Sequence, residues 1–206
     1  MPFNEGLQRY LSPRDREVLS QACIGIAGAG GLGSNVALML ARSGIGRFII
    51  VDGDVVEPSN LNRQAYFPRH VGMPKVRALR ALLEELNPDI EVDARQRWLD
   101  RETITALLPH APIWVEALDA PESKSLFVEM ALTAGVFTVS ASGMAGFGGA
   151  PMQKRRMGDR LVLVGDFTTD IAVLPPLAPK VTEAAALEAD AVLEYLLKPV
   201  ETQQKG

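Results

Sequence analysis

Apolar and polar positions along the chain fall into two alternating patterns. Short apolar runs, typical of strands buried in a parallel sheet, occupy residues 22–27, 47–51, 113–118, 136–141 and 161–165. Residues 90–94 alternate apolar and polar side chains, as a half-buried strand does. Apolar residues recur at helical spacing over residues 34–42, 74–86, 100–108, 122–134 and 181–197. Strands and helices are therefore predicted to follow one another along most of the chain.

The ends of the predicted helices carry residues that helix ends favour. Pro74 suits the first turn of its helix, and Asn87 and Pro88 end it. Asp100 is placed to cap the helix that follows it. The order of elements predicts an α/β fold that is Rossmann-like and doubly wound, with a mostly parallel sheet and helices on both faces.

Composition narrows the class of protein. With 206 residues, 47% of them hydrophobic, the chain is long enough for one substantial domain, expected over residues 1–200 with 201–206 as a flexible C-terminal tail. The net charge is −4 and the pI is about 5.3, so we do not expect a nucleic-acid partner. The first residues do not form a secretory signal, and no apolar run approaches the roughly 18 residues that span a bilayer. We therefore expect a cytoplasmic protein without a membrane partner.

A glycine-rich turn joins the first predicted strand to the first predicted helix. Gly28, Gly30 and Gly33 occupy the positions of a G-x-G-x-x-G dinucleotide-binding fingerprint, with Gly31 among them. In such a turn the glycines permit the sharp bend, the close approach of phosphate or ribose, and the packing of helix on strand. A helix start at Ser34 would present free backbone N–H groups to an anion. The turn lacks the G-x-x-x-x-G-K-[ST] pattern of a P-loop.

Acidic and polar residues follow the second predicted strand. Asp52 lies 19 residues after Gly33, where an acidic residue binds a ribose hydroxyl, and Asp54 follows it. The alternative for these two acids is a turn without a ligand. Residues 59–64 then read Ser-Asn-Leu-Asn-Arg-Gln, inside a long connection over residues 53–73. A plain NAD site does not require this polar, cationic run.

The combined stretch resembles a known family. DGDVVEPSNLNRQ, preceded by GAGGLGS and followed by GMPKV, is similar to the ThiF/MoeB/HesA group, the bacterial relatives of ubiquitin-activating E1 enzymes. The resemblance covers residues 20–140 and, more loosely, the last helix; SASGMAG at residues 140–146 is similar to the short ThiF-like branch. It implies a homodimeric enzyme that uses ATP and Mg²⁺ to adenylate the C-terminal Gly-Gly carboxylate of a small ubiquitin-like sulfur carrier, releasing pyrophosphate, in thiamine biosynthesis.

The residues of this stretch suit such chemistry in their own right. A carboxylate is ionised near pH 7 and attacks a phosphate without a general base, but the phosphate charge must be neutralised. Arg63 offers a planar fork for phosphate oxygens, and Lys75 lies at a helix start, where a cation is unfavourable unless an anion is bound. Asn60 and Gln64 are candidates to hold phosphate or ribose oxygens. Asp119, at another strand end, is a candidate to hold Mg²⁺ directly or through water.

The resemblance places the family's ATP and Mg²⁺ positions on Asp52, Asn60, Arg63, Gln64, Lys75 and Asp119. The plainer alternatives are a solvated loop cation for Arg63, a surface residue for Lys75 and a helix N-cap for Asp119. In the family an N-terminal arginine enters the partner subunit's ATP site. Arg9 and Arg14 are both candidates for this role, and each is alternatively an ordinary surface residue.

The chain departs from the family in its cysteines. Many relatives carry two Cys-x-x-Cys pairs for a structural zinc, and several carry a cysteine for a thioester or persulfide step. Cys23, within the first predicted strand, is the single cysteine and is expected to act as a small buried hydrophobe. We therefore expect no structural zinc, and the implied function ends at the adenylate. Ala120 and Lys124 replace the Asn and Arg that often follow the acidic strand end in the family.

Other interpretations remain open. An NAD(P)-dependent Rossmann oxidoreductase explains the glycines and Asp52 but not residues 59–64, whereas a non-catalytic nucleotide-binding relative explains the missing cysteines. Adenylation of a carboxylate on modified tRNA gains little from the acidic pI. Residues 154–156, Lys-Arg-Arg, are predicted as a solvated turn or as a docking patch for an acidic carrier or for pyrophosphate. Met144, Phe147 and Met152 are candidates for a carrier groove or for the core.

Overall fold

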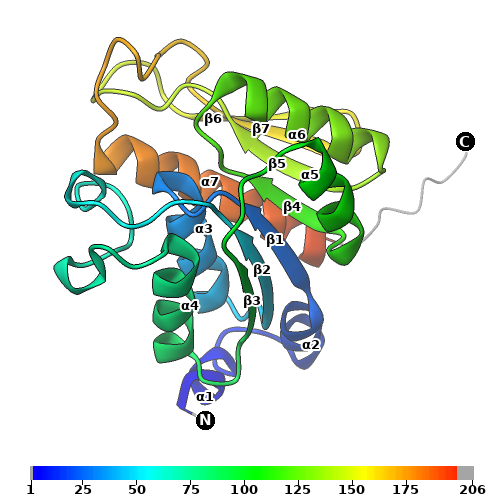
Figure 1. Cartoon of the computed structure of the whole chain (residues 1–206). Helices are drawn as coiled ribbons and strands as arrows, with labels where there is room; N and C mark the ends of the chain where they lie inside the picture. The colour runs from blue at the N-terminus through cyan, green and yellow to red at the C-terminus, as the bar shows by residue number, and fades with distance from the viewer. Residues whose placement is uncertain (1, 199–206) are drawn as a thin grey trace, which may run out of the picture.

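Seven strands form one sheet in the computed structural model, which describes residues 2–198 (Figure 1). Their order across the sheet is β3-β2-β1-β4-β5-β7-β6. All neighbouring strands pair in parallel except β6, which runs antiparallel to β7. The strands are β1 (Cys23–Ala27), β2 (Arg47–Val51), β3 (Glu91–Arg95), β4 (Ile113–Glu116), β5 (Phe137–Ala141), β6 (Gln153–Met157) and β7 (Leu161–Gly165).

Helices cover both faces of the sheet. One core joins α3, α4 and α7 to the sheet, and a second lies between the other face and α5 with α6. The helices are α1 (Pro2–Leu7), α2 (Pro13–Gln21), α3 (Gly31–Arg42), α4 (Lys75–Leu86), α5 (Arg101–Leu107), α6 (Pro121–Thr133) and α7 (Ala178–Leu197). The predicted doubly wound α/β fold is therefore confirmed. None of the helices within residues 2–198 has the length and apolar character that crossing a membrane requires.

The strand order defines the place where a ligand is expected. The chain begins the sheet at β1, proceeds outward to β2 and β3, and then returns to β4 on the other side of β1. In open α/β sheets, ligands bind beyond the carboxyl ends of the strands at such a reversal. The carboxyl ends of β1 and β4 carry the glycine turn and the segment that leads to Asp119.

Several elements differ from the sequence prediction. Residues 154–156 are not a turn: they lie in the edge strand β6, whose five residues are all exposed, because pairing with β7 needs no apolar side chains there. The helices α1 and α2 were not predicted, since α2 is a polar helix in which Leu19 alone is buried. The helix after the glycine turn begins at Gly31 rather than Ser34. The predicted tail, residues 201–206, lies outside the described part of the chain.

Two irregular segments, residues 142–152 and 166–177, project together above the carboxyl edge of the sheet (Figure 1). Asp166 lies at their base, and its carboxylate accepts hydrogen bonds from Thr168 and Thr169. The buried Lys180 joins the two segments. Its ammonium donates a hydrogen bond to the carbonyl of Ala150 and lies 3.6 Å from Oδ2 of Asp166. Residues 142–152 are thus held in place by contacts within the chain.

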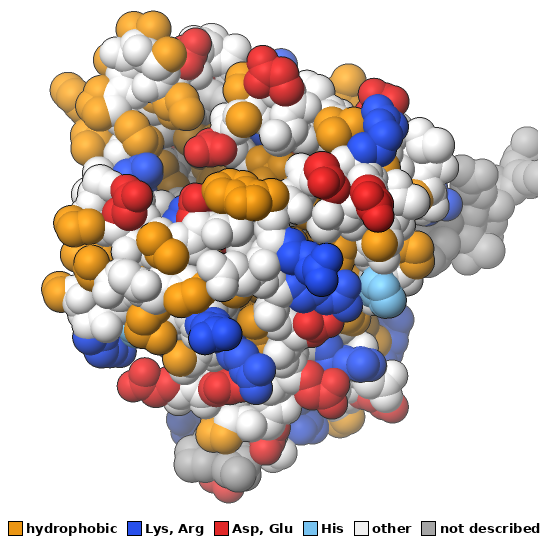
Figure 2. All heavy atoms as spheres, viewed as in Figure 1, with side chains coloured by type: hydrophobic (Ala, Val, Ile, Leu, Met, Phe, Trp, Pro, Cys, Tyr) orange, Lys and Arg blue, Asp and Glu red, His pale blue; other side chains and the backbone are white. Residues whose placement is uncertain are grey.

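Hydrophobic side chains gather at the upper left of the space-filling view, over these two segments (Figure 2). Phe147 is 83% exposed and Val173 79% exposed, whereas Met152 is buried and Met144 packs against the core. Of the three candidates for a carrier groove, Phe147 alone therefore points outward.

Candidate functional site

The glycine turn leaves the first amides of α3 open to the space beyond the sheet. Gly28 has φ +98°, and a Cβ there would lie 2.6 Å from the carbonyl oxygen of Ala117. A Cβ on Gly33 would lie 1.8 Å from the carbonyl oxygen of Gly28, so helix and turn touch. By contrast, a Cβ on Gly30 would meet only the amide of Gln64, 3.8 Å away. No side chain in the described part of the chain caps α3, so its N-terminal N–H groups can receive an anion.

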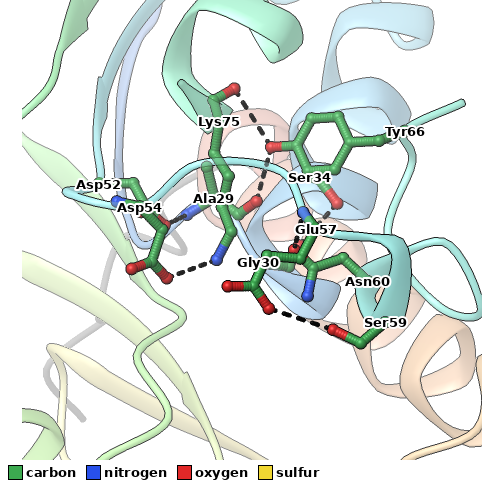
Figure 3. A network of polar contacts seen from close by, with 10 residues as sticks. All are labelled: Ala29, Gly30, Ser34, Asp52, Asp54, Glu57, Ser59, Asn60, Tyr66 and Lys75. Carbon is green, nitrogen blue, oxygen red and sulfur yellow. Dashed lines mark hydrogen bonds and ion pairs between the residues drawn. The ribbon is translucent and has the colours of Figure 1, made fainter. Parts of the chain in front are cut away.

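Asp52 connects the glycine turn to the end of β2. Its Oδ2 accepts a hydrogen bond from the backbone N–H of Ala29 at 2.7 Å, and its Oδ1 accepts one from Asp54 at 2.7 Å (Figure 3). Each carboxylate oxygen retains a further lone pair for a ligand hydroxyl. The predicted ribose-binding acid therefore lies directly beside the turn.

Lys75 and Asp54 form an ion pair next to Asp52. The Lys75 ammonium lies 2.6 Å from Oδ2 of Asp54 (Figure 3). The lysine side chain is 8% exposed and the aspartate 46%. The alternative of a surface lysine therefore fails, and the anion beside this helix start is supplied by the chain itself.

The segment 57–66 is fastened to the glycine turn by three side chains that the sequence prediction missed. Ser34 donates to the carbonyl of Gly30 and accepts from the N–H of Ala65. Asn35 donates to the carbonyl oxygens of Gly31 and Arg63. The buried hydroxyl of Tyr66 donates to Ala29, and it lies 3.3 Å from the carbonyl of Lys75 (Figure 3). These contacts hold the polar run against the helix start.

Arg63, Gln64 and Asn60 lie on this fastened segment. The carbon stem of Arg63 packs over Gly31, and its guanidinium donates to the carbonyl of Ser59 and to Asn62. Gln64 is buried, and its Oε1 has no partner among the described residues. The side-chain Oδ1 of Asn60 accepts a hydrogen bond from the N–H of Glu57. Arg63 and Gln64 therefore flank the open N-terminus of α3, whereas the Asn60 oxygen already serves its own turn.

Asp119 lies at the end of the segment that passes Gly28. It is exposed and has no hydrogen-bond partner among residues 2–198, and Ala120 is the N-cap residue of α6, so the N-cap alternative is not observed. A buried glutamate, Glu116, positions this segment: it accepts from the N–H of Leu118 and pairs with Lys124 at 2.8 Å. Lys124, noted as a departure from the family, therefore braces the turn that carries Asp119.

Few side chains in this site are suited to hold a metal ion. Within residues 2–198, no cluster of three or more His, Cys, Asp or Glu side chains could hold a metal ion. Mg²⁺ commonly takes one or two carboxylates together with substrate phosphates and water, so the free carboxylate of Asp119 fits such an ion. Mg²⁺ bound there would depend on the nucleotide for its other ligands.

Cysteine and histidine contribute little to this edge of the sheet. Cys23 begins β1 at the opposite end and is half-buried rather than buried; burial raises the pKa of its thiol, against the effect of Arg47. His70 is buried, and its Nδ1 accepts from the N–H of Phe67. Burial and the neighbouring Arg69 lower the pKa of His70, which favours the neutral imidazole.

Residues 4–160 match the ThiF family. The chain belongs to the ThiF family. Ubiquitin-like modifier-activating enzyme 5 of Caenorhabditis briggsae is 44% identical over 87 residues, which are 42% of this chain and 20% of that protein. Adenylyltransferase and sulfurtransferase uba4 of Emericella nidulans is 39% identical over 140 residues, 68% of this chain and 28% of uba4. This chain thus spans about a quarter of the length of these ThiF-family relatives.

Solved structures show the same fold. The E. coli tRNA N6-threonylcarbamoyladenosine dehydratase TcdA superposes with a TM-score of 0.86 at 17% identity, over 95% of this chain and 94% of TcdA. A second TcdA structure, in complex with AMP, gives a TM-score of 0.84 at 17% identity and covers 93% of each chain. E. coli MccB gives a TM-score of 0.71 at 26% identity, covering 88% of this chain and 58% of MccB. The ThiF-family fold therefore extends over nearly the whole chain.

Two further positions carried a weak signal in the sequence. Glu116 is the one charged residue in the apolar run of residues 113–118, and a charge there indicates a paired group. Trp98 stands in a polar stretch, Arg-Gln-Arg-Trp-Leu-Asp, outside any predicted element. Ser34, Asn35 and Tyr66 carried no such signal, because their partners are backbone groups of distant segments.

Proposed function

We propose that this chain is an ATP- and Mg²⁺-dependent adenylyltransferase. The observation that supports it most is the uncapped N-terminus of α3, flanked by Arg63 and by the unpartnered Gln64 oxygen, with Asp52 beside the turn. Free amides and a cation suit the phosphates of a nucleotide, and an acid at this place suits its ribose. The names of two relatives, ubiquitin-like modifier-activating enzyme 5 and adenylyltransferase and sulfurtransferase uba4, are consistent with such an activity.

The acceptor we propose is the C-terminal Gly-Gly carboxylate of a small ubiquitin-like sulfur carrier of the ThiS type, in thiamine biosynthesis. The names of the relatives, a ubiquitin-like modifier-activating enzyme and a sulfurtransferase, support the class of acceptor. The SASGMAG sequence at residues 140–146, similar to the ThiF-like branch, supports the pathway. Adenylation would be followed by sulfur transfer on another protein, because Cys23 lies at the far end of β1.

In the proposed reaction a carboxylate oxygen of the acceptor attacks the α-phosphorus of ATP. The bond from that phosphorus to the β-phosphate oxygen breaks, and pyrophosphate leaves with the electron pair. Arg63 and the α3 amides would neutralise phosphate charge, and Lys75, held by Asp54, would add a fixed positive charge. Asp52 would hold the ribose. Mg²⁺ bound at Asp119 would supply charge neutralisation on the phosphates.

We further propose a homodimer in which an N-terminal arginine serves the partner's site. Arg14 lies in α2, which ends directly before β1, and Arg9 precedes α2. Both therefore lie toward the amino ends of the strands, away from the glycine turn of their own chain. A second copy would be needed to bring either arginine to a nucleotide.

Carrier-dependent exchange of labelled pyrophosphate into ATP tests the activity. We expect exchange with at least one of several Gly-Gly-ending carriers, and none with a carrier whose final carboxylate is amidated. Arg63→Ala should lower the exchange rate about 100-fold. Arg80→Ala is the matched control, because Arg80 is an exposed arginine on α4 that pairs with Glu84; it should keep the wild-type rate.

Two rival functions give different results in the same preparation. Thermal stabilisation by NAD but not by Mg·ATP would indicate an oxidoreductase and overturn the proposal. Binding of Mg·ATP without exchange against any carrier would indicate a non-catalytic relative. Exchange that depends on a modified tRNA rather than on a carrier would replace the proposed acceptor and retain the adenylylation step.

A further inference from the structure

One of the two tryptophans is held in solvent beside the candidate nucleotide site. Trp114 is fully buried in the core, whereas Trp98 is 71% exposed. Trp98 lies in the connection between β3 and α5, which crosses above the carboxyl ends of the central strands (Figure 1). A large ring so exposed contributes little to the core, and exposed aromatic rings are frequent where ligands or partners bind.

The indole of Trp98 packs against the backbone of Gly53. A Cβ on Gly53 would lie 2.6 Å from Cδ2 and Cε2 of the indole and 2.9 Å from Cε3, so a side chain at residue 53 would displace the ring. The six-membered ring of the indole therefore lies over the backbone of Gly53. The exposure of the residue means that the rest of the ring remains open to solvent.

Gly53 places this ring at one end of the site. It stands between Asp52, which binds the N–H of Ala29 in the glycine turn, and Asp54, which pairs with Lys75. The ring is therefore next to the acid assigned to the ribose, on the side reached through residue 53 rather than through the phosphate-facing amides of α3. In a nucleotide, the group attached to the ribose opposite the phosphates is the base.

We propose that Trp98 is the platform on which the base of the nucleotide stacks. This inference rests on the proposed nucleotide site and adds a residue for its base. Aromatic rings stack on the flat face of a base with useful affinity, and stacking is tolerant of base identity. Gly53 is required because the ring must lie close to the loop that carries Asp52.

Tryptophan fluorescence tests the contact directly. The buried Trp114 gives a constant background, so a change on titration with Mg·ATP reports on Trp98. We expect quenching that saturates with Mg·ATP and is absent with Mg·tripolyphosphate, which has phosphates and no base. In Trp98→Phe the ATP-dependent change should disappear although ATP still binds.

Binding measurements by calorimetry give the second test. Trp98→Ala should weaken Mg·ATP binding about 10-fold and leave tripolyphosphate binding unchanged, whereas Trp98→Phe should stay close to wild type. Tyr195→Ala is the matched control, because Tyr195 is a partly exposed aromatic residue on α7 that stacks on Phe137 at the start of β5, away from the glycine turn; its ATP affinity should not change.

The outcomes separate this inference from the proposed function. Unchanged ATP affinity in Trp98→Ala, together with weak binding in Arg63→Ala, overturns the platform and leaves the nucleotide site intact. A defect of Trp98→Ala confined to the acceptor assigns the ring to the acceptor and also overturns the platform. Failure of the wild-type protein to bind Mg·ATP overturns both.

Discussion

The ammonium of Lys75 lies 2.6 Å from Oδ2 of Asp54, at the first residue of α4. A positive charge at a helix N-terminus opposes the helix dipole, and burial removes much of its hydration. Asp54 offsets both effects, and its carbonyl also accepts the backbone N–H of Lys75. The ion pair therefore fixes the positive charge of Lys75 beside the glycine turn.

Lys75→Met should therefore separate catalysis from stability. Methionine keeps the length of the buried stem but removes the charge, so we expect the pyrophosphate exchange rate to fall about 100-fold. The free energy of unfolding should change by less than about 1.5 kcal/mol, since an apolar replacement of similar volume is tolerated. Urea denaturation and the exchange assay measure the two quantities.

Asp54→Asn is the companion variant, because it leaves the buried lysine without its anion. We expect it to lower the free energy of unfolding by about 1–2 kcal/mol, and the loss should vanish in the double variant with Lys75→Met. A Lys75→Met protein with wild-type exchange would show that Lys75 has a structural role only.

Tyr66→Phe should loosen the polar run without altering any proposed ligand. Burial and the neighbouring Asp52 carboxylate raise the pKa of Tyr66, so its hydroxyl stays protonated and donates to the carbonyl of Ala29. Removing it should cost about 1–2 kcal/mol of unfolding free energy and raise the KM for ATP more than it lowers kcat. An unchanged KM in steady-state kinetics would argue that the hydroxyl does not position the site. Tyr195→Phe, at a partly exposed tyrosine on α7, is the control.

Much of the fold follows from local pattern, because buried parallel strands are short apolar runs and their helices carry apolar stripes. β7 was predicted with its observed ends, Leu161–Gly165. β6 was missed for a physical reason: an edge strand needs only backbone pairing, and its residues are polar and exposed. The pattern of apolar residues reveals a strand only where its side chains are buried, and β6 has no buried side chain.

In the candidate site, the features set by spacing along the chain could be predicted, whereas contacts between remote segments could not. Glycine positions and the acid at the end of β2 follow from spacing along the chain, and the structure brings them together through Ala29. The partner of Lys75 did not follow, because Asp54 is 21 residues away and was interpreted as a ligand for the nucleotide. Trp98 and Gly53 are similarly remote in sequence, and only the folded chain shows that they touch.

Asp166 should make the protein sensitive to acid. Burial alone would raise the pKa of this carboxyl, but hydrogen bonds from Thr169 and Thr168 outweigh it and hold the pKa at about 2. A depressed pKa gives stability that is present above the ordinary value of about 3.8 and is lost as the pH falls toward 2. We expect the unfolding free energy of the wild type to fall between pH 4 and 2 more steeply than that of Asp166→Asn.

The same comparison at pH 7 should show Asp166→Asn to be less stable by about 1–2 kcal/mol, because the amide replaces a charged acceptor. Urea denaturation at several pH values gives both results. Parallel pH curves for the two proteins would mean that Asp166 has the same pKa folded and unfolded.

Glu188→Met should stabilise the protein at neutral pH. Both carboxyl oxygens of Glu188 are buried in α7 without a hydrogen-bond partner among residues 2–198. Burial raises the pKa of Glu188 well above its ordinary range; Lys124 opposes this effect and Glu116 adds to it. Methionine fills a similar volume without polar atoms, so the free energy of unfolding should rise by about 1–3 kcal/mol at pH 7.

The pH dependence of that gain distinguishes the carboxyl from a simple packing effect. A raised pKa gives the wild type stability that is fully present below the unfolded-state value of about 4.3 and is lost as the pH rises through the folded-state value. The advantage of Glu188→Met should therefore grow from pH 4.5 to pH 7 in urea denaturation. Glu183→Met, at an exposed glutamate on the same helix, should show no comparable gain. A Glu188→Met protein less stable than wild type at pH 7 would mean that the carboxyl has a binding partner in solution, such as a buried water.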